Sequence, residues 1–430
     1  MIKPGAVREY VKGSLWVWPG LSAVAALLAG SVVSQIDVRP GSPLAFQGTA
    51  DDARALLTMI AGTVVTVIAL VLGLTVVALQ LSSTQFSPRL LRKFLRDRSN
   101  QIVLSVFVAT FVYSTAGLYT VGLASGARIE EFPRLAVSGA IVLLFASMAM
   151  VVYFADHLAH SIQVDAIGSR VERDTLAVVR GRLDGVVEVP APTPPGWAVA
   201  LPAVRSGYVE TVRPDPLLDW ACRHRVVIKL RVRVGEHVVA GTTLGWVWTV
   251  TTDLPAVDLI EARAELDRAV RIGFERTLEQ DAALGIRQLV DMACKALSPA
   301  VNDPYTAVQA IDHLSVIFCA LAVRPLGDWI VADAGGAAVI VPGRRFGDYL
   351  ATMCGLIRRY GCAEPTLSLA LLRLLANCAA LTADPARRSA ISEQADLIVA
   401  DATRSIAQPA DLAGVTDSGA ALQASLLPHP

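Results

Sequence analysis

The sequence predicts a membrane α-helical protein with four transmembrane helices, followed by a mixed α+β cytoplasmic lobe that contains a small barrel-sandwich-like β module. Three observations predict this fold class. The 430 residues are 53% hydrophobic and only 18% charged, whereas soluble domains average roughly 25% charged residues. The apolar excess is concentrated before residue 156. Beyond it, helical periodicity alternates with one strand-rich segment, which indicates a folded lobe outside the membrane.

The predicted transmembrane domain covers residues 1–155. A helix needs about 20 apolar residues to cross the hydrocarbon core of a bilayer. Four stretches meet this requirement and contain no Asp, Glu, Lys, Arg or His: about 15–36, 55–81, 102–123 and 135–155. The first follows basic residues as a signal peptide does, but it is too long for one and three more spans follow, so we predict a signal anchor. The lipid bilayer is therefore an expected partner.

The orientation follows from the Lys and Arg residues in the short connections between spans, which accumulate on the cytoplasmic side. The N-terminus carries three (Lys3, Arg8, Lys12) and the connection between the second and third spans carries five. The two opposite connections carry two each. Both termini are therefore predicted to be cytoplasmic, together with everything after residue 155.

The second span differs from the others in length and composition. Its 27 residues exceed the thickness of the hydrocarbon core, so it must tilt or project into the cytoplasm. Small and hydroxyl side chains recur along it, among them Gly62, Thr63, Thr66 and Gly73. Such residues let membrane helices pack closely, which is the interpretation we favour. The alternative is that they line a hydrated pore.

A basic segment follows the second span. Ser87 is a suitable N-cap and Pro88 suits the first helical position. Beyond them, apolar residues on one helical face alternate with four basic residues on the other: Arg89, Arg92, Lys93 and Arg96. We predict a short amphipathic helix at the inner leaflet, whose basic residues contact anionic lipid headgroups.

Several of these segments are similar to a known family. The resemblance rests on Gln85–Arg89 (QFSPR), Gln101–Leu104 (QIVL), Phe111–Tyr113 (FVY), Glu279–Asp291 (EQDAALGIRQLVD) and Ser298–Pro304 (SPAVNDP). Together they resemble a bacterial family of predicted membrane proteins catalogued as domain of unknown function 2254, over roughly residues 10–400. The resemblance implies a bacterial inner (plasma) membrane protein. It implies no activity, because the family has no established one.

Four further segments follow the spans. Residues 156–196 are predicted to form a helical extension and a Pro-rich linker. Residues 197–250 read as a small β module that resembles a biotinyl/lipoyl-like barrel-sandwich, with a short helix around 217–222. The exposed hairpin of that module lacks the lysine of a carrier, so a structural role is favoured. Residues 258–405 are predicted to be a helical domain with a hairpin candidate near 329–341, and residues 406–430 a disordered tail.

Some polar side chains of the lobe suggest sites, each with an ordinary alternative. His157 and His160 lie one helical turn apart, but two imidazoles are weak evidence for a metal. Asp303 and Pro304 are predicted to start a helix as its N-cap and first residue. Asp281, Arg287 and Asp291 could line a polar pocket, although pairing across neighbouring helices is the interpretation that we favour.

The sequence contains no P-loop, GxSxG, HExxH or dinucleotide-binding fingerprint, so we expect no enzyme and assign no catalytic, cofactor-binding or metal-binding residue. A net charge of zero gives no indication of a nucleic-acid partner. We therefore predict a homo-oligomeric channel or transporter with a cytoplasmic regulatory lobe. The alternative is a membrane-anchored scaffold or sensor that binds a cytoplasmic protein partner or ligand, without transport or catalysis. Charge-free spans argue against proton-coupled transport.

Overall fold

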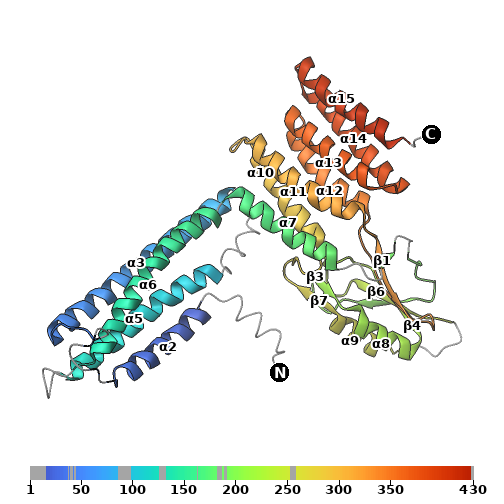
Figure 1. Cartoon of the computed structure of the whole chain (residues 1–430). Coiled ribbons are helices and arrows are strands. Elements are labelled where there is room, and N and C mark those ends of the chain that lie inside the picture. The colour runs from blue at the N-terminus through green and yellow to red at the C-terminus, as the bar shows by residue number, and fades with distance from the viewer. Residues whose placement is uncertain are drawn as a thin grey trace. The chain divides into compact units, whose positions relative to one another are not determined.

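The computed structural model describes residues 16–36, 38, 42, 45–85, 98–124, 132–161, 163–181, 186–187, 191–251 and 258–427. These residues form two compact units that divide between Ala166 and Ile167. We call the first the helical unit and the second the lobe, and describe each by itself (Figure 1). The four basic residues predicted to contact lipid headgroups, Arg89, Arg92, Lys93 and Arg96, lie outside the described residues.

The helical unit contains four long apolar helices where the sequence predicts spans. They are α2 (Val17–Val33), α3 (Ala50–Gln85), α5 (Arg98–Ala124) and α6 (Arg134–Ser161). Helices α2, α3 and α6 all pack against α5 (Figure 1). Leu57, Phe107 and Val137 are fully buried where these helices meet. The hydrophobic contacts within the unit thus centre on α5, and the opposite faces of the other helices remain open.

Three of these helices are long and apolar enough to cross a bilayer, over Ala50–Ala78, Arg98–Val121 and Arg134–His160. Helix α2 has 17 residues and is therefore about 25 Å long, which is slightly less than the hydrocarbon thickness. The chain is a membrane protein with several apolar helices.

Helix α11 (Pro304–Ala322), in the lobe, also has the length and hydropathy of a span, but its surroundings are those of a protein core. It packs against α10 and α13, and its Ile311 and Phe318 are fully buried. Asp312 and His313 of the same helix pair with side chains of neighbouring lobe helices. These polar side chains meet protein partners, which is the usual condition for such groups in a protein core. The predicted cap is confirmed, because the Asp303 carboxylate accepts from the Thr306 amide at 3.1 Å.

The lobe contains two open β-sheets. The larger has six strands in the order β1-β8-β9-β4-β6-β2, and the smaller has three in the order β5-β3-β7. The bounds are β1 (Val186–Val187), β2 (Val199–Pro202), β3 (Gly207–Val212), β4 (Val226–Leu230), β5 (His237–Val238), β6 (Thr243–Thr249), β7 (Val270–Gly273), β8 (Asp328–Ala332) and β9 (Ala338–Val341). Among the strands that the structure describes, β4 and β9 pair in parallel and the other pairings are antiparallel.

The sheets differ from the predicted β module in two respects. Among the described residues no closed barrel forms, and the strands of residues 197–250 are divided between the two sheets. The hairpin near 329–341 is confirmed as β8 and β9, but it joins the larger sheet, where Ile228 of β4 lies beside Val339 of β9. The physical reason is that alternating hydrophobicity identifies a strand but not the strand it pairs with. Here β9 lies about a hundred residues beyond β4 in the chain.

Two helices complete the core around the sheets. The predicted short helix is confirmed as α8 (Pro214–His224), which is amphipathic and buries Leu217 and Trp220. Helix α9 (Leu259–Ala269) begins at Asp258, whose carboxylate accepts from the amides of Ile260 and Glu261. These helices pack against one another and share a single buried cluster with both sheets.

The rest of the lobe is a helical bundle. It consists of α10 (Ala282–Ala296), α11, α12 (Phe346–Gly361), α13 (Pro365–Leu381), α14 (Pro385–Ser405) and α15 (Pro409–Leu426). The prediction of a disordered tail from residue 406 is wrong over α15, which packs against α13 and α14. Its composition is rich in Ala, Ser and Gly, but Val415 and Leu422 lie two turns apart and are buried. Tertiary packing of that narrow apolar stripe stabilises a helix of weak propensity.

Helix α7 (Val164–Gly181) follows α6 after two residues, so the predicted continuous extension is interrupted. It docks on α10 and α11 at two glycines. A Cβ on Gly285 would lie 1.8 Å from the Thr175 hydroxyl, and a Cβ on Gly168 would lie 2.5 Å from the His313 ring. Between these contacts, Glu172 Oε2 lies 2.7 Å from His313 Nδ1. Only glycine permits backbones to approach this closely.

Candidate functional site

Helix α3 presents its small side chains away from the other helices. Gly62, Thr63, Thr66 and Gly73 are all exposed, and a Cβ added at either glycine would meet no atom within 4 Å. At 3.6 residues per turn, the stripe of Gly62, Thr66 and Gly73 lies opposite the buried face of α3. Only 17% of the apolar window of α3 is buried inside the helical unit. The stripe therefore packs against no other helix that the structure describes in this unit.

Two threonine hydroxyls on this helix are satisfied by its own backbone. Thr66 Oγ1 donates to the Gly62 carbonyl at 3.1 Å, and Thr75 Oγ1 donates to the Val71 carbonyl at 2.7 Å. Hydroxyls bonded in this way need no water and tolerate an apolar environment. At Thr66 the exposed face can accordingly contact lipid or a second protein helix without leaving this hydroxyl donor unpaired.

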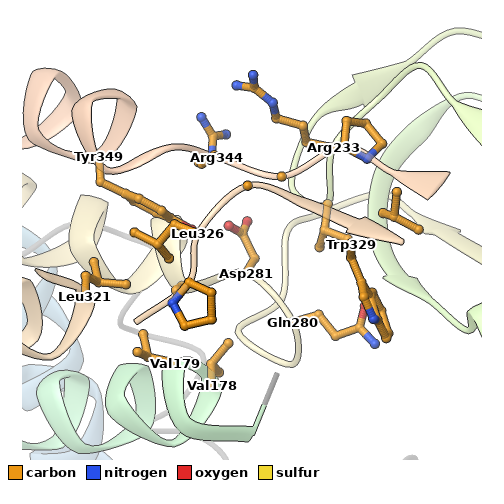
Figure 2. A pocket seen from close by; sticks show the side chains of 17 residues that line it. Val178, Val179, Arg233, Gln280, Asp281, Leu321, Leu326, Trp329, Arg344 and Tyr349 are labelled. Carbon is orange, nitrogen blue, oxygen red and sulfur yellow. The ribbon is translucent and has the colours of Figure 1, made fainter. Parts of the chain in front are cut away.

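A second candidate site is a cavity in the lobe, of about 90 Å³. It lies where the β8–β9 hairpin, the loop after β4, the start of α10 and the end of α7 meet (Figure 2). Asp281 stands near its centre, with Arg233 and Arg344 on one side and Val178 and Val179 on the opposite side. The cavity thus has one charged wall and one apolar wall.

Asp281 is the most buried charged group of the cavity, with a side chain only 4% exposed. Its Oδ2 accepts from Arg276 Nε at 2.8 Å, and Arg276 Nη2 lies 2.7 Å away. Burial raises the pKa of Asp281 above its ordinary value, while the charges of Arg276 and Arg344 act in the opposite direction. Because burial prevails, the ion pair does not fully compensate for the loss of water around the carboxylate.

Gly235 allows the loop after β4 to reach Asp281. Its backbone has a φ of +87°, a region that favours glycine, and a Cβ there would lie 2.0 Å from Asp281 Oδ2. The Gly235 amide also donates to the Val209 carbonyl at 2.8 Å, which fixes the loop to β3. No local sequence pattern marks the carboxylate beside this loop.

Two other contacts fix the walls of the cavity. The Gln280 side chain forms both hydrogen bonds of an amide pair with the backbone of Val212, at 2.9 and 3.1 Å. The Gly343 amide donates to Asp328 Oδ1 at 3.0 Å, and a Cβ on Gly343 would lie 1.6 Å from the Gly327 carbonyl oxygen. The segment that carries Arg344 is therefore held against the segment before β8.

The charged wall carries one cation in excess. Arg276 pairs with Asp281, and Arg233 lies 3.7 Å from Asp348. Arg344 has no hydrogen bond or ion pair with any residue that the structure describes, and acts on Asp281 through its charge alone. The start of α10 adds the partial positive charge of a helix N-terminus. The electrostatic balance of this wall therefore favours an anion.

The side chains around the cavity suit binding rather than nucleophilic chemistry. None of its lining residues is a Ser, Thr, Cys, His or Lys. The six cysteines are free, and burial raises the pKa of Cys294 to about 11 and that of Cys354 to about 12. Thiols with raised pKa values are poor nucleophiles. A hydrogen bond with Cys378 instead lowers the pKa of Cys319, but Cys319 does not line the cavity.

The structure separates the polar residues that the sequence grouped together. Asp281 lines the cavity, whereas Arg287 and Asp291 form an ion pair one turn apart on the exposed side of α10, at 2.7 Å. This contact between Arg287 and Asp291 thus lies within α10, and the polar-pocket alternative applies to Asp281. No periodic signal marks Arg276 or Arg344, which sequence analysis missed because both lie in irregular segments.

The predicted histidine pair remains a surface feature. His160 Nδ1 lies 3.3 Å from Asp156, and both side chains are well exposed. Among the described residues, no group of three His, Cys, Asp or Glu side chains could hold a metal ion.

Comparison with known proteins places this fold in a wider group. The model of a family described as "Predicted membrane protein (DUF2254)" matches residues 12–377. An uncharacterised protein of Mycobacterium tuberculosis (strain CDC 1551 / Oshkosh) is 44% identical over 427 residues, which is 96% of this chain and 81% of that protein. An uncharacterised protein of Mycobacterium bovis shows the same identity and coverage. No solved structure matches the chain.

Proposed function

The chain belongs to the DUF2254 family of predicted membrane proteins, and from this premise we propose that it is a homo-oligomeric channel or transporter of the bacterial inner membrane with a cytoplasmic regulatory lobe. The observation that carries the proposal is the outward-facing stripe on α3. In this proposal α3 helices of several copies meet around a symmetry axis, and the protein has no enzymatic activity. A cytoplasmic lobe follows from the distribution of Lys and Arg in the sequence.

The geometry of α3 supports self-association in two ways. Its 36 residues give a length of about 54 Å, well beyond the hydrocarbon core, so copies can remain in contact outside the membrane. The small residues on the exposed face allow neighbouring backbones to approach closely, as membrane helix interfaces require. Identical chains usually associate around a closed symmetry axis. Thr63 and Thr66 then lie at or near that axis.

Replacement of Thr66 by leucine is expected to disrupt the oligomer and any conductance, because a bulky side chain separates helices that meet at small residues. Light scattering measures the oligomeric state of the purified wild type and variant in detergent. Ion flux is measured with both proteins in liposomes. Val65→Leu is the matched control, since Val65 is exposed but points a quarter turn away from the stripe. A wild-type chain that is monomeric and passes no ions contradicts the proposal.

A second function, favoured by the cavity around Asp281, is that of a membrane-anchored sensor or scaffold. The lobe then binds a ligand or a cytoplasmic protein, and the chain neither transports nor catalyses. The cavity supports this function because it combines a buried polar floor with an open cationic wall. Ligand binding by an oligomer that passes no ions is the result that favours the sensor over the channel.

A further inference from the structure

We propose that the lobe cavity binds a small amphipathic organic anion, with its carboxylate or phosphate at Arg344 and Arg233 and its apolar part against Val179, Leu321 and Leu326. This inference deepens the sensor function by naming the ligand class. Binding is measured separately from ion flux, so failure of the one does not imply failure of the other.

The charges of the cavity select an anion. Arg276 already neutralises Asp281, and the Asp348 partner of Arg233 is 43% exposed, so its attraction is screened by water. Arg344 has no partner among the described residues and is one of the residues that line the cavity. A guanidinium presents a planar fork of donors that matches the oxygens of a carboxylate or phosphate. An anionic group at this wall therefore replaces water at two arginines.

The opposite wall selects an apolar body. Seven aliphatic or proline side chains line the cavity: Val178, Val179, Leu321, Pro325, Leu326, Val341 and Pro342. Trp329 and Tyr349 add aromatic surface at the two ends. A fully hydrated inorganic ion leaves this surface uncovered, whereas a ligand with a hydrocarbon or aromatic part removes it from water.

The space allows such a ligand to be only partly enclosed. The cavity of about 90 Å³ holds a group of a few heavy atoms. It adjoins an open groove of about 880 Å³, with which it shares Val178, Gln280 and Trp329. A compact anionic group and the adjoining part of its apolar substituent fit the cavity, and the rest of the substituent extends toward the groove.

The cavity also contacts the helix that leads to the membrane. Val178 and Val179 lie in the last turn of α7, and the Val179 carbonyl accepts from Arg324 at 3.1 Å. Helix α7 begins two residues after α6 ends. A ligand in contact with Val179 therefore contacts α7, the helix that follows the last membrane helix in the chain.

The test uses three probes that separate charge from apolar surface: phenyl phosphate, inorganic phosphate and phenol. Each is titrated by calorimetry into the full chain in detergent. Phenyl phosphate is expected to bind saturably and at least about tenfold more tightly than either other probe. Only this probe carries both an anionic group for the arginines and a ring for the apolar side chains. Arg344→Gln is expected to weaken it about tenfold or more, since a charge-assisted hydrogen bond is lost.

Arg263→Gln serves as the matched control, because Arg263 is exposed on α9 and does not line the cavity. It should leave the affinity for phenyl phosphate unchanged. Near-ultraviolet circular dichroism confirms that both variants are folded. The proposal is overturned if phenyl phosphate shows no saturable binding, if phenol binds as tightly, or if folded Arg344→Gln binds like the wild type.

Discussion

Replacement of Asp281 by alanine is expected to destabilise the lobe by about 3–5 kcal/mol, the usual effect of removing one partner from a buried ion pair. Arg276 has a side chain only 21% exposed and would lose its carboxylate partner. The measurement is urea unfolding of the full chain in detergent, followed by fluorescence. Five of the seven tryptophans lie beyond residue 166, so the signal mainly reports the lobe.

A double variant distinguishes the charge pair from simple packing. Burial raises the pKa of Asp281 despite two nearby arginines, so the pair is not expected to be strongly favourable relative to apolar side chains of similar size. Asp281→Leu combined with Arg276→Met should therefore be less destabilising than Asp281→Leu alone. If the double variant loses as much unfolding free energy as Asp281→Leu alone, or more, Arg276 tolerates the loss of its partner.

Replacement of Gly285 by alanine is expected to destabilise the lobe by about 1–3 kcal/mol, the range observed for overpacked cores. The added Cβ would lie 1.8 Å from Thr175 Oγ1 and 2.9 Å from Thr175 Cβ. Since both Gly285 and Thr175 are buried, α7 must move away from α10. Thermal unfolding of the full chain, monitored as above, measures the loss.

Gly355→Ala is the matched control for this substitution. Gly355 lies in the interior of α12, and a Cβ there would meet nothing within 4 Å. Alanine is intrinsically better than glycine in a helix by about 1 kcal/mol, so this variant should be neutral or more stable. Adding Thr175→Gly to Gly285→Ala should recover part of the loss. A destabilised Gly355→Ala, or no recovery, contradicts the proposed contact between α7 and α10.

The membrane helices could be predicted because their signal is local. An uncharged stretch such as 55–81 is long enough to span a bilayer whatever surrounds it, and the structure forms a helix there. The N-cap at Asp303 was equally readable, since a capping carboxylate and the following proline act within four residues. The small residues of α3 were recognised in the same way. The direction in which these small residues point could not be predicted, because it depends on which face of α3 is covered by α5 and α6.

The cavity could not be predicted from local patterns. Gly235, Asp281 and Arg344 come from three irregular segments, and each segment by itself reads as a turn or a helix start. They converge because the β8–β9 hairpin pairs with β4 and because Gly235 admits the Asp281 carboxylate. The tail shows the same dependence: composition suggested disorder from residue 406, yet Val415 and Leu422 find a surface on α13 and α14.

The sequence by itself determined that this chain enters a membrane, through which segments, and where several of the lobe helices begin. Those features depend on residues close together in the chain and on their transfer from water to lipid. Only the tertiary structure decided that the stripe on α3 faces outward, that Arg344 lacks a carboxylate partner among the described residues, and that α15 is folded. These outcomes depend on contacts between distant segments, whose free energies have no counterpart in a local pattern.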